Sequence, residues 1–231
     1  MWRTLAAFVP LHGCHHGDRV TTLPPQSAYR LLAANYEEAP NPLLALERRS
    51  LAPLLPDVRG KHVIDAAAGK GYWATHCIRR GAAAIAVDFC EEMLRNAPRP
   101  AVLADMNHLP FPGEFADLTI CALGLGYAPH ALAELRRVTR PGGVILASDV
   151  HPDAIRAGWT RTFRHGNEVI DVEHQRYSLE ELRGAGLSLT ALVEPSFGEP
   201  ERELFAQAGR LHRFDEATRQ PAIFVARWTR L

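Results

Sequence analysis

The stretch Val63-Ile64-Asp65-Ala66-Ala67-Ala68-Gly69-Lys70-Gly71 decides the fold. Two β-branched residues lead into an aspartate, small residues follow, and Gly-Lys-Gly precedes a segment with helical spacing. This order predicts a strand, a tight turn and a helix N-terminus. Glycine lets a ligand approach bare backbone, and the free N–H groups of a helix N-terminus attract polar or anionic groups. We therefore expect a ligand at the carboxyl edge of a sheet.

Short apolar runs alternate with helical segments along the rest of the chain. Such alternation is typical of a doubly wound α/β sheet whose parallel strands are buried on both faces. Three strands end on Asp65, Asp88 and Asp105, and the ends of parallel strands meet at the ligand crevice. The strands are expected at residues 62–66, 83–87, 101–104, 117–123, 144–150, 187–193 and 222–227.

The segments that flank this core are expected to form the substrate side of a single domain that spans 25–231. Residues 25–56 carry two helical patterns, and residues 152–177 contain a predicted hairpin insertion. Residues 1–24 are expected to be a flexible leader. This leader holds a cluster that fits no standard zinc spacing, so we expect no metal site there: His12, Cys14, His15 and His16.

Composition excludes several classes of protein. The chain has 231 residues, with 26 Lys+Arg and 26 Asp+Glu, and this balance argues against a protein that mainly binds the phosphate backbone of nucleic acid. The four cysteines form no C-x-x-C pair, which favours a reducing compartment, and we expect a cytoplasmic protein. No apolar run is long enough to span a membrane. The sequence leaves monomer and homodimer open.

The glycine turn alone allows two kinds of cofactor. Gly69-Lys70-Gly71-Tyr72-Trp73-Ala74 also fits the dinucleotide fingerprint G-x-G-x-x-G/A, and Asp88 follows about 20 residues on, where a ribose-binding acid belongs. An NAD(P)-dependent oxidoreductase is therefore one alternative. Asp65, however, lies just before the turn, where it would repel a pyrophosphate and would favour a cationic or ammonium-bearing ligand.

Further motifs follow in a fixed order. Asp105-Met106 precedes Leu109-Pro110-Phe111, and Arg140-Pro141-Gly142-Gly143 precedes a strand. With the glycine turn and Asp88, these motifs make residues 25–228 resemble the class I S-adenosylmethionine-dependent methyltransferases, in the branch called methyltransferase type 11 or ubiquinone-biosynthesis-like.

The resemblance implies a Rossmann-like doubly wound fold. Its sheet would have seven mostly parallel strands in the order 3-2-1-4-5-7-6, with the last strand antiparallel and helices on both faces. It also implies S-adenosyl-L-methionine as cofactor and methyl transfer to oxygen, nitrogen or carbon of a small molecule. A non-catalytic S-adenosylmethionine-binding protein is a further alternative.

The resemblance also implies roles for individual residues. Asp65 would lie near the amino group of the methionine moiety, Asp88 would accept hydrogen bonds from the ribose hydroxyls, and Asp105 would bind the adenine amino group. The implied cofactor-binding residues are Tyr36, Asp65, Ala66, Ala67, Gly69, Gly71, Asp88, Phe89, Met93, Asp105, Met106, Ala122 and Leu123.

Two positions depart from the family pattern. Ala67 replaces the first glycine of the usual motif, and Gly126-Tyr127 replaces a histidine pair. We predict His151 as the catalytic contact to the acceptor, ahead of His130, Tyr127 and Asp149, although His151-Pro152 could merely end a strand. The expected acceptor-facing residues are Trp159, Arg161, Phe163, Arg164, His174, Arg176 and Tyr177.

Overall fold

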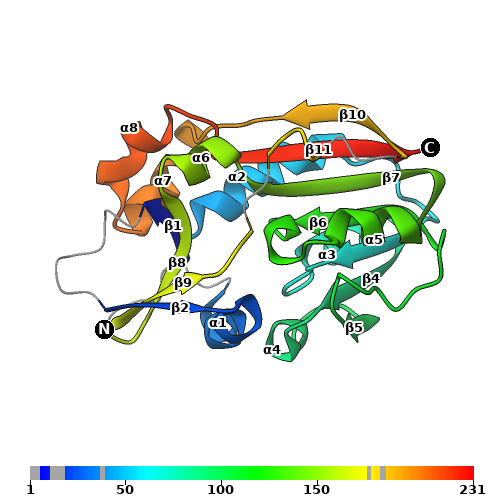
Figure 1. Cartoon of the computed structure of the whole chain (residues 1–231), viewed down its shortest axis with the longest axis horizontal. Helices are drawn as coiled ribbons and strands as arrows, with labels where there is room; N and C mark the ends of the chain where they lie inside the picture. The colour runs from blue at the N-terminus through cyan, green and yellow to red at the C-terminus, as the bar shows by residue number, and fades with distance from the viewer. Residues whose placement is uncertain (1–5, 11–18, 37–39, 176–177, 183–185) are drawn as a thin grey trace.

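The computed structural model describes residues 6–10, 19–36, 40–175, 178–182 and 186–231. Two sheets organise these residues (Figure 1). The seven-stranded sheet runs across the right-hand part of the view, and the four-stranded sheet lies at the left, above helix α1 (Pro25–Leu32). No described helix is long and apolar enough to cross a membrane.

The large sheet has the predicted topology. Its order is β5-β4-β3-β6-β7-β11-β10, and β11 is antiparallel to both of its neighbours while the remaining strands are parallel to one another. Numbered within this sheet alone, the order is 3-2-1-4-5-7-6, so the prediction of a doubly wound, mostly parallel sheet is confirmed. The strands are β3 (His62–Ala66), β4 (Ala83–Asp88), β5 (Ala101–Leu103), β6 (Ala116–Ala122), β7 (Thr139–Val150), β10 (Leu187–Val193) and β11 (Ile223–Arg230).

Alternate residues of the central strands face opposite layers of helices. Leu146 of β7 joins the core cluster that contains Leu46, whereas its neighbour Ile145 joins the cluster that contains Leu135. Burial on both faces explains why these strands read as continuous apolar runs. The first layer holds α2 (Pro42–Leu51), α3 (Tyr72–Ile78), α7 (Glu199–Gln207) and α8 (Phe214–Ala217), and the second holds α5 (Ala131–Val138).

The prediction of a flexible leader over residues 1–24 is wrong for two segments. Strand β1 (Ala6–Pro10) pairs antiparallel with β8 (Trp159–His165), and β2 (Arg19–Leu23) pairs parallel with β9 (Glu168–Val172). The predicted hairpin is confirmed as β8–β9, and its two open edges offer backbone donors and acceptors that the leader strands pair with. The cluster His12, Cys14, His15 and His16 lies outside the described residues.

Short elements connect these layers. Asn41 caps α2, because its side-chain oxygen accepts hydrogen bonds from the N–H groups of Leu43 and Leu44 at 3.1 and 3.2 Å. Residues 140–143, which precede the strand expected at 144–150, bulge out of β7, where the pairing with β6 skips from Thr139 to Val144. The remaining helical segments are η2 (Ala33–Asn35), η3 (Ala52–Leu54), α4 (Glu91–Leu94), η4 (Leu125–Tyr127), α6 (Pro152–Arg156) and η5 (Leu211–Arg213).

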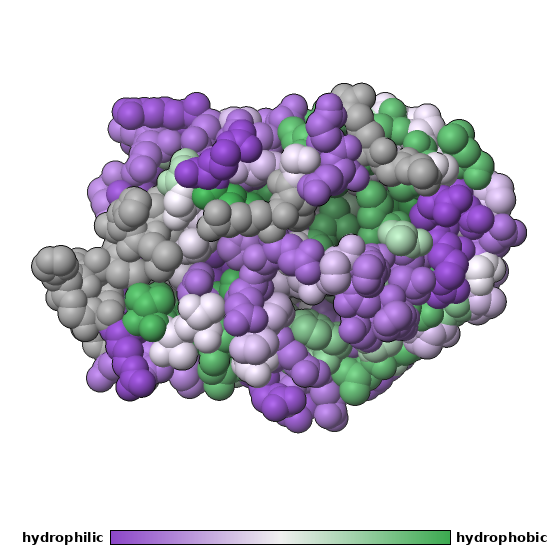
Figure 2. Space-filling view, viewed as in Figure 1, coloured by the Kyte–Doolittle hydropathy of each residue, from purple (hydrophilic) through white to green (hydrophobic). Residues whose placement is uncertain are grey.

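The surface seen in this view mixes hydrophilic and hydrophobic side chains. Figure 2 shows hydrophilic residues over most of this face, with hydrophobic residues gathered mainly on the right, over the large sheet.

Candidate functional site

The glycine turn joins the carboxyl end of β3 to the N-terminus of α3. Asp65 is buried with 1% of its surface exposed, and its Oδ2 accepts a hydrogen bond from the N–H of Ala74 in the first turn of α3 at 2.8 Å. Gly71 precedes this helix with a φ of +77°, a conformation that suits glycine. Burial raises the pKa of Asp65 to about 7, although the bond from Ala74 opposes the shift. The turn therefore holds an acid inside the crevice.

Asp88 ties the end of the neighbouring strand β4 to the same turn. Its Oδ2 accepts a hydrogen bond from the N–H of Gly69 at 2.8 Å, and its Oδ1 accepts one from the N–H of Cys90 at 2.9 Å. Burial raises the pKa of Asp88 despite these bonds. The N–H of Phe89 also bonds this carboxylate, which leaves about one of its four lone-pair sites for a hydrogen bond from a ligand.

The first cavity lies beside Asp88 and spans about 310 Å³. Asp105, beyond the end of β5, lines it with an exposed carboxylate, and Met106 adds a buried thioether. A mainly apolar cavity that two carboxylates also line suits a flat, hydroxyl-bearing group. The lining residues are Ala67, Asp88, Phe89, Ala104, Asp105, Met106, Tyr127 and Ala128.

The second cavity lies on the other side of Ala67, which lines both, and spans about 400 Å³. It combines the carboxyl groups of Glu47 and Asp65 with the cationic side chains of Arg48 and Lys70. Acids and bases in one cavity match the two charges of an amino acid. The other lining residues are Tyr36, Leu44, Ala68, Tyr72, Trp73, Ala122 and Leu123.

The sequence interpretation missed Glu47. This side chain is 2% exposed, and its carboxyl oxygens accept hydrogen bonds from Trp73 Nε1 and Ser148 Oγ, each at 3.3 Å. Burial raises its pKa to about 8. A signal was present, since Glu47 is four residues from both Leu43 and Leu51, which places an acid within the apolar stripe of α2.

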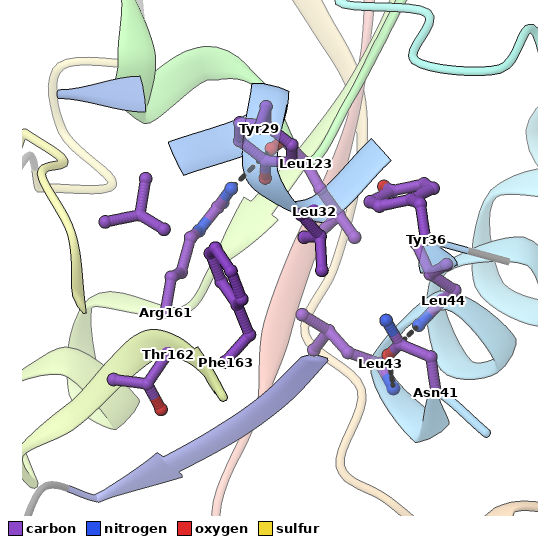
Figure 3. A pocket seen from close by; sticks show the side chains of 11 residues that line it. Tyr29, Leu32, Tyr36, Asn41, Leu43, Leu44, Leu123, Arg161, Thr162 and Phe163 are labelled. Carbon is purple, nitrogen blue, oxygen red and sulfur yellow. Dashed lines mark hydrogen bonds between the residues drawn. The ribbon is translucent and has the colours of Figure 1, made fainter. Parts of the chain in front are cut away.

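The third cavity, of about 480 Å³, opens between α1, α2 and the hairpin strand β8 (Figure 3). It shares Tyr36, Leu44 and Leu123 with the second cavity, so the two cavities are adjacent. Its walls are mainly aliphatic and aromatic. They are formed by Tyr29, Leu32, Tyr36, Asn41, Leu43, Leu44, Leu123, Arg161, Thr162, Phe163 and Val172.

Arg161 places a guanidinium group in the wall of this third cavity. It is 7% exposed, its Nη1 donates to the carbonyl oxygen of Leu123 at 2.6 Å, and its Nη2 forms an ion pair with Asp149. The guanidinium lies 4.5 Å from the ring centroid of Tyr127, and Asp149 also accepts a hydrogen bond from the N–H of Gly126 at 2.6 Å. Arg161 is among the lining residues of the cavity and Asp149 is not, so the cation is the member of the pair that lies at the cavity wall.

The predicted cofactor residues gather around the first two cavities. Met93 Cε and Tyr36 Cε1 lie 3.1 and 3.8 Å from where a Cβ on Gly69 would be, and buried Ala66 ends β3 directly before Ala67. Phe89 and Met106 line the first cavity. The residues from Tyr36 to Leu123 that the sequence singled out thus come together from the N-terminal segment and from four strand ends.

His151 does not reach these cavities, contrary to our prediction of a catalytic contact. Its Nδ1 accepts a hydrogen bond from the N–H of Asp153 at 3.1 Å and thereby caps α6, and its Nε2 bonds Glu194 at 2.8 Å. Trp159, expected on the acceptor side, stacks on Phe197 in the core instead. Arg176 and Tyr177 lie outside the described residues.

Comparison with known proteins identifies the family. A model described as a methyltransferase domain matches residues 64–147. A malonyl-[acyl-carrier protein] O-methyltransferase of Yersinia pestis is 30% identical over 187 residues, which cover 74% of this chain and 68% of that protein. The chain belongs to the S-adenosylmethionine-dependent methyltransferases. Like its relatives, this methyltransferase uses S-adenosylmethionine, so the nicotinamide alternative and the non-catalytic alternative are set aside.

Other matches to this methyltransferase agree with the assignment. A ubiquinone/menaquinone biosynthesis C-methyltransferase of Ralstonia nicotianae is 33% identical over 147 residues, which cover 54% of this chain and 60% of that protein. A solved S-adenosylmethionine dependent methyltransferase of Mesorhizobium loti superposes with a TM-score of 0.62 at 20% identity, over 81% of this chain and all of that one. This superposition shows that the two proteins share a fold. The carboxylate-lined first cavity and the two-charge second cavity fit an adenosine joined to an amino acid.

Proposed function

We propose that this methyltransferase methylates a carboxylate oxygen of a small, largely apolar acceptor that enters the third cavity. One observation carries the proposal: a buried guanidinium, that of Arg161, lies in an otherwise mostly apolar cavity that adjoins the cofactor cavities through Leu123. Bound S-adenosylmethionine supplies an electrophilic methyl group on a sulfonium. The protein's task is to orient the acceptor and to exclude water.

The cofactor assignments are part of this proposal. Asp88 accepts hydrogen bonds from the ribose hydroxyls, while Asp105 and Met106 hold the adenine. Asp65 binds the ammonium group of the methionine moiety, and Arg48 and Lys70, which line the same cavity, neutralise its carboxylate. The observed bond from Gly69 to Asp88 supports this arrangement, because it fixes the acid against the turn.

The acid–base properties of the third cavity support an acceptor that arrives ionised. None of the described residues that line the three cavities is a histidine. Burial raises the pKa of Tyr36 and of Tyr127, so neither phenol ionises to act as a base near neutral pH. A neutral hydroxyl would need such a base, whereas a carboxylate with an ordinary pKa of about 4 is already ionised.

The relatives offer a second candidate function. The Yersinia protein is named for O-methylation and the Ralstonia protein for C-methylation. Carbon methylation of an aromatic acceptor draws support from the rings of Tyr29, Tyr36 and Phe163 in the wall of the third cavity. The cationic side chain of Arg161 favours the carboxylate acceptor over this alternative.

The chemistry of the product tests the proposal. The enzyme is incubated with methyl-labelled cofactor and a panel of small carboxylic acids, phenols and amines. A methyl ester releases labelled methanol on mild alkaline hydrolysis, whereas methyl ethers, methylamines and C-methyl products do not. We expect alkali-labile label that depends on Arg161, with Arg161→Lys retaining more activity than Arg161→Gln because lysine keeps the positive charge beside Asp149. Alkali-stable product would overturn carboxylate methylation.

We further propose that the enzyme works in the cytoplasm on small molecules rather than on nucleic acid. The buried thiols of Cys77, Cys90 and Cys121 are free, which suits a reducing compartment. The equal numbers of acidic and basic residues give the chain no net charge for binding a polyanion.

A further inference from the structure

Glu47 lines the second cavity but has no role among the cofactor contacts proposed for Asp65, Arg48 and Lys70. It is carried by α2, outside the strand-end motifs, yet it lines the second cavity together with Asp65. Its hydrogen-bond donors, the indole of Trp73 and the hydroxyl of Ser148, are neutral, and each bonds a different oxygen of the carboxyl group. Hydrogen bonds from neutral donors compensate a buried negative charge only in part.

The groups that face Glu47 come from several elements. Asp65 from β3 adds a second carboxyl group, and its negative charge raises the pKa of Glu47 further, whereas Arg48 on α2 lowers it. Lys70 from the turn and Tyr72 from α3 line the same cavity. The guanidinium of Arg48 stacks 3.6 Å from the ring centroid of Tyr72. Two buried carboxyl groups that line one cavity favour a positively charged group there.

We propose that Glu47 is a second ammonium-binding residue, so that the ammonium group of the cofactor's methionine moiety binds between Glu47 and Asp65. The proposal rests on S-adenosylmethionine as cofactor. Helix α2 would then have two roles, because Glu47 binds the cofactor and Leu43 and Leu44 of the same helix line the acceptor cavity. A cofactor bound through Glu47 thus fixes the helix against which the acceptor packs.

Binding of an ammonium group should change the protonation of Glu47 and Asp65. In the ligand-free protein, burial raises the pKa of Glu47 to about 8 and that of Asp65 to about 7, so Glu47 is largely protonated and Asp65 about half protonated at pH 7. An ammonium group favours their ionised forms, so a ligand that carries one releases protons from Glu47 and Asp65 when it binds. A ligand without an amino-acid end releases none from these two groups.

Two ligands separate this role from a merely structural one. S-adenosylhomocysteine carries the ammonium group, and 5′-methylthioadenosine lacks the whole amino-acid end. We expect Glu47→Gln to weaken S-adenosylhomocysteine roughly 10- to 100-fold in titration calorimetry, as the loss of a charge-assisted contact predicts, and to leave 5′-methylthioadenosine within about twofold. Equal weakening of both ligands, or of neither, would overturn the proposal.

A matched variant and a wild-type measurement complete the experiment. Glu201→Gln removes another buried carboxylate that contacts α2, through Arg49 at 2.8 Å and away from the cavities, and should change neither affinity. In wild-type protein at pH 7, titrations in buffers of different ionisation enthalpy should show proton release with S-adenosylhomocysteine and not with 5′-methylthioadenosine. Equal proton release with both ligands would reject the role of Glu47 even if the variant does not fold. Absence of any S-adenosylhomocysteine binding to wild type would refute the cofactor assignment itself.

Discussion

A Cβ on Gly124 would lie 2.7 Å from the Cβ of Ala67 and 3.0 Å from Sγ of Cys121. Ala67 stands where the family pattern has its first glycine, and its φ is +54°, a region that strains an L-residue. The methyl group of Ala67 therefore has room because Gly124 has no side chain. This pair sits where the two cofactor cavities meet, since Ala67 lines both.

The close approach of Ala67 and Gly124 predicts that substitutions at these two positions change the free energy of unfolding non-additively. Ala67→Gly should stabilise the protein by about 0.5–1 kcal/mol, because relief of the left-handed strain exceeds the entropic cost of glycine. Gly124→Ala should destabilise by about 1–3 kcal/mol through overpacking, and by less when Ala67 is already glycine. Denaturant unfolding of the wild type, both single variants and the double variant measures the coupling. Strictly additive changes would contradict the contact.

Asp88→Asn should weaken cofactor binding by more than it weakens folding. Asparagine keeps one oxygen to accept the bond from Gly69, but it loses the negative charge and the second oxygen, which accepts the N–H of Cys90. We expect S-adenosylhomocysteine to bind about 10- to 100-fold more weakly, which corresponds to roughly 1.4–2.8 kcal/mol. Calorimetric titration beside thermal unfolding checks this. If the variant binds S-adenosylhomocysteine as tightly as wild type does, Asp88 does not bind the ribose.

The strand-end aspartates were predictable because local patterns determine them. Asp65 and Asp88 each close a short apolar run, and parallel strands bring such ends to one edge wherever the chain is long enough to cross over. Strands β1 and β2 were not predictable, because β2 gains its partner from β9, where Arg19 lies opposite Glu168, far along the chain. Pairing between remote segments leaves little trace in local spacing.

The same distinction between local sequence pattern and remote packing explains which site residues the sequence did not predict correctly. Glu47 was overlooked because charged residues between leucines usually mark the solvated face of a helix, and only packing against Trp73 and Ser148 shows that this one is inside. His151 was overvalued because its place after a strand fixes the backbone but not the direction of the ring, which Glu194 and Asp153 set.

The raised pKa values of Glu47 and Asp65 predict that the ligand-free protein loses stability as pH rises. In the unfolded chain these groups ionise near 4.5 and 3.8, whereas in the folded chain they hold their protons to about 8 and about 7. Between these values the unfolded state binds fewer protons, so the free energy of unfolding falls as pH increases.

Glu47→Gln should remove the Glu47 part of this dependence. The variant should match the wild type near pH 4.5, where the carboxyl group is protonated in the folded state, and should be more stable at pH 8 by about 1–3 kcal/mol. Thermal or denaturant unfolding at pH 4.5, 6 and 8 measures the difference. A difference that stays constant with pH would show that Glu47 is already ionised when buried.

His151 provides a test that distinguishes a cap from a catalytic contact. His151→Ala removes the acceptor for the N–H of Asp153 and the bond to Glu194, so we expect a loss of about 1–2 kcal/mol, or a fall of a few degrees in Tm. His151→Asn should recover most of the capping part, because asparagine is a preferred N-cap residue. Since the imidazole does not line the described cavities, kcat measured below the unfolding transition should stay within about threefold of wild type in both variants, an effect under about 1 kcal/mol. A loss of kcat of about a hundredfold at unchanged stability would instead return His151 to the acceptor site, through a movement that brings its ring away from Glu194.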